Sequence, residues 1–286
     1  MNHFYVITNW QKDPHLTISA RIAEYLNTKN IRCTVQQLDR NEYAGRYKYT
    51  DPRQIPEDVD CVIVLGGDGT VLRAARDLVD RHIPIFGVNM GTLGYLAEVD
   101  EVHLEEALEC LVMDEYMTQE RMMLKGSVSK KNKVVLSDVA LNDIVITRNG
   151  RLHVMQFHVY VNDRFLYAYS ADGIIVSTPT GSTGYNLSAG GPIVDPSASM
   201  ILLTPVAAHA LTARSVILAD DAKVKIVIER RNNGMEMAEA TFDGDTSVIM
   251  KSGDTIEIEK AESTVTFVKI DQISFLEILR RKMAES

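Results

Sequence analysis

An apolar segment that runs directly into a glycine-rich turn and then into an amphipathic helix constrains the fold most. Residues 61–65 are Cys-Val-Ile-Val-Leu, an uninterrupted apolar run that predicts a parallel strand buried on both faces. Between residues 71 and 79 apolar side chains recur on one helical face, and residues 83–88 form a second apolar run. This β-α-β pattern requires a right-handed crossover in a parallel sheet. We therefore predict a Rossmann-like α/β layer in the first part of the chain.

The second half of the chain is predicted to be mainly β. Strand-like segments separated by Asn, Asp and Gly turns span residues 134–147, 153–162, 164–177, 223–229, 237–243 and 255–268. With 286 residues and about 150 residues per domain, two domains are expected. We predict an α/β domain at 1–115, a β-rich domain at 116–270, and a C-terminal helix within 271–286 that packs on the α/β domain.

Composition excludes several classes of protein. The net charge of -9 would repel nucleic-acid backbones and acidic membranes, so neither is an expected partner. No apolar stretch approaches the roughly 18 residues that a membrane-spanning helix needs, and residues 1–8 resemble a strand rather than a signal peptide. The cysteines, Cys33, Cys61 and Cys110, show no C-x-x-C spacing. These features favour a cytoplasmic protein.

The turn after the first buried strand is Gly66-Gly67-Asp68-Gly69-Thr70. Its glycines allow the backbone to approach a ligand closely, and the helix that follows offers free N–H groups to phosphate. Asp68 would repel phosphate unless it binds a cation or accepts a proton from a hydroxyl group that attacks phosphorus. We favour this functional interpretation over a plain turn with a capping aspartate.

Two common nucleotide-binding motifs are absent. Neither the dinucleotide pattern G-x-G-x-x-G nor the Walker pattern G-x-x-x-x-G-K-[ST] occurs, which disfavours ordinary redox enzymes of Rossmann type and P-loop ATPases. A second glycine-rich turn, residues 89–95, follows the next strand. Since the carboxyl ends of neighbouring parallel strands share one edge of a sheet, this turn is expected beside Asp68. A simple β-to-α turn is an equally good explanation of it.

The β-rich half contains a loop that is dense in polar groups. Residues 177–192 hold six hydroxyl side chains of Ser and Thr and four glycines, together with Tyr185, whose ring could stack on a base. This composition predicts a nucleoside-binding loop. Residues 141–143, Leu-Asn-Asp, and Asp172 place polar groups in otherwise apolar strands, which indicates either a buried hydrogen-bond network or ligand contacts. Residues 243–245, Asp-Gly-Asp, lack the spacing of a calcium loop and predict a hairpin turn.

Taken in order, these motifs closely resemble those of the NAD kinases. The G-G-D-G turn is shared with diacylglycerol and sphingosine kinases and, more loosely, with phosphofructokinases, whereas the loop from Thr178 to Pro192 is specific to NAD kinases. The match extends from about Cys61 to the carboxyl end. The resemblance implies a C-terminal domain of β-sandwich type, an active site between the two domains, and homodimers or homotetramers.

The resemblance also implies a reaction: transfer of the γ-phosphoryl group of ATP, or of polyphosphate, to the 2′-hydroxyl of the adenosine ribose of NAD, with a divalent cation, Mg²⁺, beside ATP. Asp68 would then be the general base, and Arg73 would reach the donor. The full set of residues expected to bind substrates is Gly67, Gly69, Thr70, Arg73, Tyr95, Asn142, Asp143, His153, Asp172, Thr180, Thr183, Gly184, Tyr185, Asn186, Leu187, Ser188 and Asp245. No metal-binding residue is assigned.

The chain departs from the family pattern in places. Family members often carry Glu at the position of Asp143, and many carry Ala at that of Gly184. Two alternatives remain open: a lipid or diacylglycerol-type kinase that shares the G-G-D-G turn, and a non-catalytic regulator that binds NAD(H) or NADP. The lipid kinase would need an apolar acceptor groove, whereas residues 180–188 are largely polar. The regulator would not need Asp68.

Overall fold

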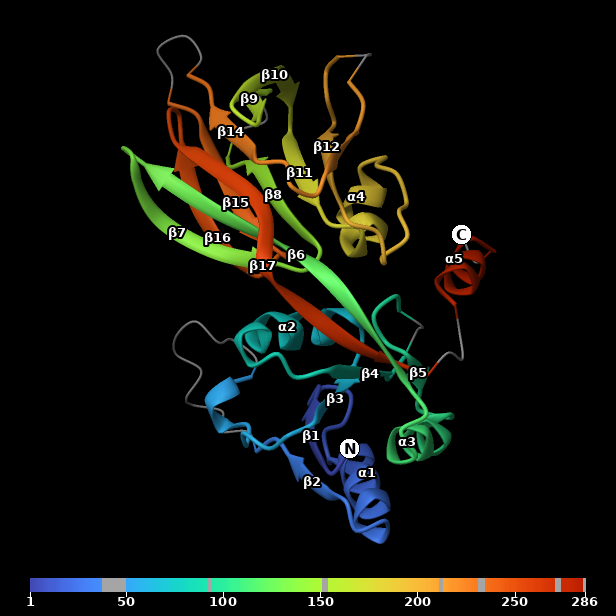
Figure 1. Ribbon diagram of the computed structural model, residues 1–286. Helices are drawn as coiled ribbons and strands as arrows, with labels where there is room; N and C mark the ends of the chain where they lie inside the picture. Colours follow the sequence, from blue (N-terminus) through green and yellow to red (C-terminus); the bar gives the residue numbers. More distant parts are fainter. Residues whose placement is uncertain are drawn as a thin grey trace. The chain divides into compact units, whose positions relative to one another are not determined.

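The chain forms two compact units, described here from a computed structural model (Figure 1). The structure describes residues 1–37, 50–91, 94–150, 154–210, 213–230, 235–270 and 274–284. Unit 1 comprises Met1–Arg121 and Thr264–Ser286, and unit 2 comprises Met122–Ser263. Two long strands, β6 (Met117–Lys130) and β17 (Thr255–Lys269), carry the chain from one unit into the other. The domain limits predicted at residues 115 and 270 stay predictions.

Unit 1 contains the predicted parallel sheet. Its strands run in the order β5-β4-β3-β1-β2, all paired in parallel, and β17 continues the sheet beside β4. Every residue of β1, β3 and β4 is buried, as expected of parallel strands covered on both faces. The bounds are β1 (His3–Thr8), β2 (Arg32–Val35), β3 (Cys61–Gly66), β4 (Ile85–Asn89) and β5 (Val99–Asp100).

Helix α2 lies where the apolar periodicity of residues 71–79 predicts a helix. Helix α2 contributes Val71, Ala74 and Ala75 to the buried side and connects β3 to β4, which completes the predicted β-α-β unit. It ends at Asp77, and a short 3₁₀ turn, Val79–Arg81, leads to His82 in the left-handed region (φ 52°). The helices are α1 (Thr17–Thr28), η1 (Pro52–Gln54), α2 (Asp68–Asp77), η2 (Val79–Arg81), α3 (Leu104–Val112) and α5 (Phe275–Ala284).

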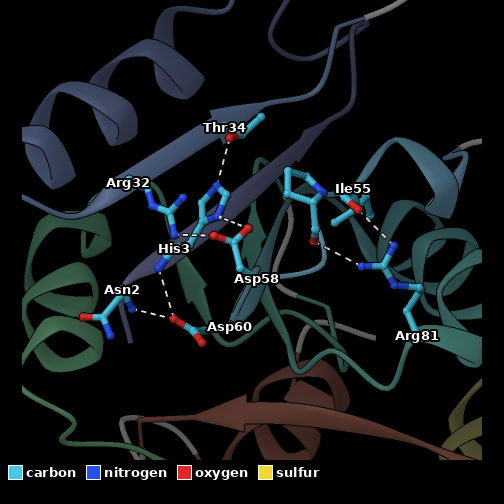
Figure 2. A network of polar contacts seen from close by, with 9 residues as sticks. Asn2, His3, Arg32, Thr34, Ile55, Asp58, Asp60 and Arg81 are labelled. Carbon is cyan, nitrogen blue, oxygen red and sulfur yellow. Dashed lines mark hydrogen bonds and ion pairs between the residues drawn. The ribbon is translucent and has the colours of Figure 1, made fainter.

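A polar network joins the amino-terminal ends of β1 and β2 to the segment that precedes β3 (Figure 2). His3 is buried; its Nδ1 lies 3.1 Å from Asp58 Oδ1, and its Nε2 lies 2.9 Å from Thr34 Oγ1. The backbone N–H of His3 donates to Asp60 (3.1 Å). Arg81 donates to three backbone carbonyl oxygens of the preceding loop. Because these contacts lie at the edge of the sheet opposite the glycine turns, we interpret them as structural.

Unit 2 is a sandwich of two antiparallel layers. One layer is a six-stranded sheet in the order β13-β12-β11-β8-β15-β16, and the other contains β10-β9-β14-β17 and the β6–β7 hairpin. Ile144 and Phe242 of the first layer share one apolar core with Phe157 and Ile226 of the second. The new strands are β7 (Lys133–Ala140), β8 (Asp143–Arg148), β9 (Met155–Val161), β10 (Arg164–Ala171), β11 (Gly173–Ser177), β12 (Met200–Val206), β13 (Val216–Ala219), β14 (Val224–Ile228), β15 (Met237–Phe242) and β16 (Thr246–Lys251).

The predicted fold class is confirmed: an α/β first half and a mainly-β second half of sandwich type. The hydroxyl-rich loop folds into a 3₁₀ turn, η3 (Thr180–Thr183), followed by the short helix α4 (Tyr185–Ser188). Among the described residues, no helix has the length and apolar character needed to cross a membrane.

Candidate active site

Asp68 is the first residue of α2 and lies at the carboxyl end of β3. The backbone N–H of Tyr95 donates to its Oδ2 (2.7 Å), and that of Leu96 donates to its Oδ1 (3.0 Å). A Cβ atom added to Gly94 would lie only 1.9 Å from Asp68 Oδ1. Residue 94 must therefore be glycine for the second glycine turn to approach the carboxylate this closely. The two glycine turns therefore meet as predicted. Each carboxylate oxygen accepts one hydrogen bond and retains lone-pair capacity for a hydroxyl proton or a cation.

Tyr95 links this site to the C-terminal helix. Its ring centroid lies 6.1 Å from that of Phe275, and the ammonium group of Lys282 lies 5.2 Å from the centre of the Tyr95 ring. Burial and, second, the negative charge of Asp68 raise the pKa of the Tyr95 hydroxyl. The neighbouring Thr92 and Leu93 lie outside the described residues.

A cavity of about 480 Å³ lies beside the G-G-D-G turn. It brings together four of the predicted site residues, Gly67, Gly69, Thr70 and Arg73. The rest of its lining, residues 9–12 (Asn-Trp-Gln-Lys), was missed by sequence reasoning. These residues directly follow β1, so the rule that ligands bind at the carboxyl ends of parallel strands could have found them.

In unit 2, the Asp243 carboxylate holds the backbone of the Leu-Asn-Asp segment, residues 141–143. The sequence predicted Asp243 only as part of a hairpin turn. Asp243 accepts hydrogen bonds from the backbone N–H groups of Leu141 (2.8 Å), Asn142 (2.8 Å) and Asp143 (3.0 Å). The N–H of Asp243 in turn donates to the carbonyl oxygen of Asp143 (3.0 Å). Asp243 and Gly244 both have positive φ (51° and 68°), as the predicted hairpin turn between β15 and β16 requires. This turn therefore fixes the backbone that carries Asn142 and Asp143.

Asp143 is a buried carboxylate. Its side chain is 6% exposed, and burial together with the negative charge of Asp243 raises its pKa to about 7. A buried acid with a pKa near neutrality is a frequent feature of functional sites. The Asp143 side chain, which is shorter than the glutamate that family members often carry here, thus lies in an environment that favours its protonated form.

The hydroxyl-rich loop packs directly on this strand. The N–H of Thr178 donates to the carbonyl oxygen of Asn142 (2.9 Å), and Thr178 Oγ1 donates to that of Leu141 (2.6 Å). A Cβ atom on Gly184 would lie 3.8 Å from Asn142 Nδ2 and 4.0 Å from Asp143 Oδ2. The structure therefore brings together three of the predicted residues, Asn142, Asp143 and Gly184.

Other predicted residues of the loop divide into internal and exposed groups. Asn186 is fully buried; its Nδ2 donates to the carbonyl oxygens of Ser182 (3.2 Å) and Pro192 (3.0 Å), and its Oδ1 accepts from Thr204 Oγ1 (2.7 Å). Thr180 is buried as well. The exposed side chains are those of Tyr185, Leu187 and Ser188, while that of Thr183 is half-buried and donates to the carbonyl oxygen of Thr180 (3.5 Å).

Three further predicted residues lie elsewhere in unit 2 or outside the described chain. Asp172 precedes β11 and forms an ion pair with Arg148 (3.0 Å). Asp245 is the last residue of the turn between β15 and β16. His153 lies outside the described residues. The assignment of all these residues to substrates stays a prediction.

Comparison with known protein families identifies both halves of the chain. Residues 4–116 match the ATP-NAD kinase N-terminal domain, and residues 141–270 match the ATP-NAD kinase C-terminal domain. The chain belongs to the ATP-NAD kinase family. This family member is 44% identical over 295 residues to the NAD kinase of Lachnospira eligens, and the alignment covers 99% of this chain and all of that relative. It is 46% identical over 289 residues to the NAD kinase of Agathobacter rectalis, covering 99% of each.

Solved structures of NAD kinases share the fold of this family member. A crystal structure of yeast NADH kinase complexed with NADH has a TM-score of 0.80 at 24% identity, covering 98% of this chain and 86% of that one. A crystal structure of an NAD kinase from Archaeoglobus fulgidus in complex with ATP has a TM-score of 0.74 at 25% identity, covering 99% of this chain and 98% of that one.

Proposed function

We propose that this chain is an NAD kinase, which transfers the γ-phosphoryl group of ATP to the 2′-hydroxyl of the adenosine ribose of NAD and so makes NADP. Relatives named NAD kinase align over nearly its whole length, and both family domains match. The observation that carries the proposal is the Asp68 carboxylate, which two backbone N–H groups hold beside a polar cavity. Neither a lipid kinase nor a non-catalytic regulator is favoured, because the matches include the polar loop as well as the G-G-D-G turn.

Asp68 serves as the general base in this proposal. One of its oxygens accepts the proton of the 2′-hydroxyl while the hydroxyl oxygen forms a bond to the γ-phosphorus. The bond from that phosphorus to the β-γ bridging oxygen breaks, and ADP leaves with the electron pair. Phosphoryl transfer asks a protein mainly for alignment and neutralisation of charge. The two N–H donors of residues 95 and 96 fix the direction in which the carboxylate points.

Magnesium would arrive with ATP rather than occupy a site built by the protein alone. Within the described ranges, no three or more His, Cys, Asp and Glu side chains lie together as a metal-binding group. Mg²⁺ commonly takes one or two carboxylates and completes its coordination with substrate phosphates and water. Asp68 is the carboxylate that fits this donor set, and bound Mg²⁺ would neutralise phosphate charge. Inorganic polyphosphate is an alternative donor of the same chemistry.

Unit 2 would bind NAD through the segment that Asp243 fixes. Asn142 and Asp143 offer an amide and a carboxyl group to ribose hydroxyls, and Tyr185, which is 44% exposed, offers a ring for stacking on a base. The predicted contacts of Asp172 and Asp245 with NAD belong to the same proposal. We further propose that the protein is cytoplasmic and works as a homodimer or homotetramer.

The test of this proposal is the variant Asp68→Asn in an assay that detects NADP with an NADP-specific dehydrogenase. The wild type should form NADP from NAD, ATP and Mg²⁺, and the variant should lose about 10²–10⁴-fold in kcat while still binding NAD in calorimetry. Glu106→Gln, an exposed charge on α3, is the control and should keep wild-type turnover. Near-native kcat in Asp68→Asn would remove Asp68 from the role, and absence of NADP formation by the wild type would refute the proposed function.

A further inference from the structure

The cavity beside the G-G-D-G turn has a charge opposite to that of the whole chain. Its lining consists of Asn9, Trp10, Gln11, Lys12, Gly67, Gly69, Thr70 and Arg73. Two of these side chains are cations and none is a carboxylate, although the chain carries a net charge of -9. A cavity of about 480 Å³ is in the size range of sites for small ligands. Its chemistry is therefore that of a binding site for an anion.

The ammonium group of Lys12 lies close to both glycine turns, the one that contains Gly67 and the one that contains Gly91. A Cβ atom on Gly67 would lie 3.4 Å from Lys12 Nζ, and a Cβ atom on Gly91 would lie 3.2 Å from it. Since Gly67 follows β3 and Gly91 follows β4, the ammonium group lies at the shared carboxyl edge of these two strands. Within the part of the chain that the structure describes, Lys12 forms no ion pair. A lysine that is not neutralised by the protein is available to a ligand.

The segment that carries Lys12 is anchored to the sheet and to α2. The N–H of Asn9 donates to the carbonyl oxygen of Leu65 at the end of β3 (2.9 Å), and Asn9 Nδ2 donates to Thr70 Oγ1 in α2 (3.1 Å). A turn then brings the N–H of Lys12 to the carbonyl oxygen of Asn9 (2.8 Å). The backbone position of Lys12 is therefore fixed relative to the G-G-D-G turn.

We propose that Lys12 binds the phosphate chain of the phosphoryl donor in this cavity, together with Arg73. Lysine binds phosphate as a compact point charge and arginine as a planar fork, so the two side chains can contact successive phosphate groups. The inference rests on the proposed function for the identity of the donor. ATP and inorganic polyphosphate share this chemistry, and Lys12 would hold either of them next to Asp68.

The experiment compares Lys12→Met with the wild type in a binding assay that does not depend on turnover. Trp10 is the only tryptophan of the chain and lines the cavity, so its fluorescence reports on a ligand there. Sodium tripolyphosphate and ATP are titrated separately, each with Mg²⁺ and without NAD, and calorimetry repeats both titrations. The control is Lys133→Met, which removes an exposed lysine in the β6–β7 hairpin.

We expect Lys12→Met to weaken binding of both ligands by about tenfold or more, because it removes one charge-assisted contact to phosphate. In the NADP assay its KM for ATP should rise by a similar factor while its KM for NAD stays within about twofold, and Lys12→Arg should restore most of the loss. Tighter binding of ATP than of tripolyphosphate would identify ATP as the donor held there, and the reverse would identify polyphosphate.

Unchanged binding of both ligands in Lys12→Met, together with an unchanged KM for ATP, would overturn this inference while leaving the proposed function intact. A wild-type protein that binds tripolyphosphate through Lys12 but forms no NADP would overturn the proposed function and retain the anion site. The two failures are therefore distinguishable by experiment.

Discussion

Replacing Asp143 by Asn is expected to remove a loss of stability that unit 2 undergoes as pH rises toward neutrality. Asp143 is 6% exposed, and burial and the Asp243 carboxylate raise its pKa from 3.8 to about 7. In the unfolded chain the same group has its ordinary pKa. Between these two values the native state keeps a proton that the unfolded state has released. By linkage, the free energy of unfolding falls as pH rises through this window.

The magnitude follows from the size of the shift. Each pH unit between the two pKa values changes the free energy of unfolding by about 1.4 kcal/mol, so a shift of roughly three units amounts to on the order of 4 kcal/mol. The contribution is absent below the unfolded pKa and reaches its full size above about pH 7. Asparagine cannot ionise, so Asp143→Asn should lack this decline. From about pH 5 to about pH 7.5, the variant should gain roughly 3 kcal/mol relative to the wild type.

Urea unfolding followed by circular dichroism at a series of pH values measures this difference. The control is Asp221→Asn, an exposed aspartate whose replacement should leave the pH dependence of the wild type unchanged. The free energy of unfolding of Asp143→Asn, relative to that of the wild type, should rise progressively between about pH 5 and about pH 7.5. Parallel curves for the wild type and Asp143→Asn across this range would refute the reasoning, because they would show that Asp143 is already ionised at low pH.

Two further substitutions test the geometry around the two candidate sites. Gly94→Ala adds a methyl group whose carbon would lie 1.9 Å from Asp68 Oδ1, so the carboxylate must move. The kcat should therefore fall at least tenfold while the KM for NAD changes little. An unchanged kcat would show that the turn adjusts without cost. Asn186→Ala removes three buried hydrogen bonds, so the free energy of unfolding, measured by urea unfolding, should drop by about 3 kcal/mol. A loss below about 0.5 kcal/mol would contradict the structural role of this side chain.

The site residues that could be predicted from the sequence carry a local signal, whereas those that were missed depend on contacts with residues distant in sequence. Asp68, Asn142 and Asp143 were found because each stands in a polar or glycine-rich interruption of an apolar run, which is a local signal. The position of Lys12 directly after the first strand is the only signal that could have found it, and Asp243 stands in a segment that resembles an ordinary surface turn. Their importance arises from contacts with residues distant in sequence: Asp243 is 102 residues from Leu141, to which it is hydrogen-bonded. No local pattern records such a contact.

The sequence by itself determined which elements form and which family the chain resembles. Uninterrupted apolar runs, helical periodicity and glycine-rich turns are properties of neighbouring residues, and they suffice to place a β-α-β unit in the first half and antiparallel strands in the second. Only the tertiary structure decided which turns meet. Strand order and register place the N–H groups of residues 95 and 96 on Asp68 and the Lys12 ammonium group between Gly67 and Gly91. The packing of unit 2 likewise buries Asp143 beside Asp243, and the resulting desolvation and charge repulsion set its pKa.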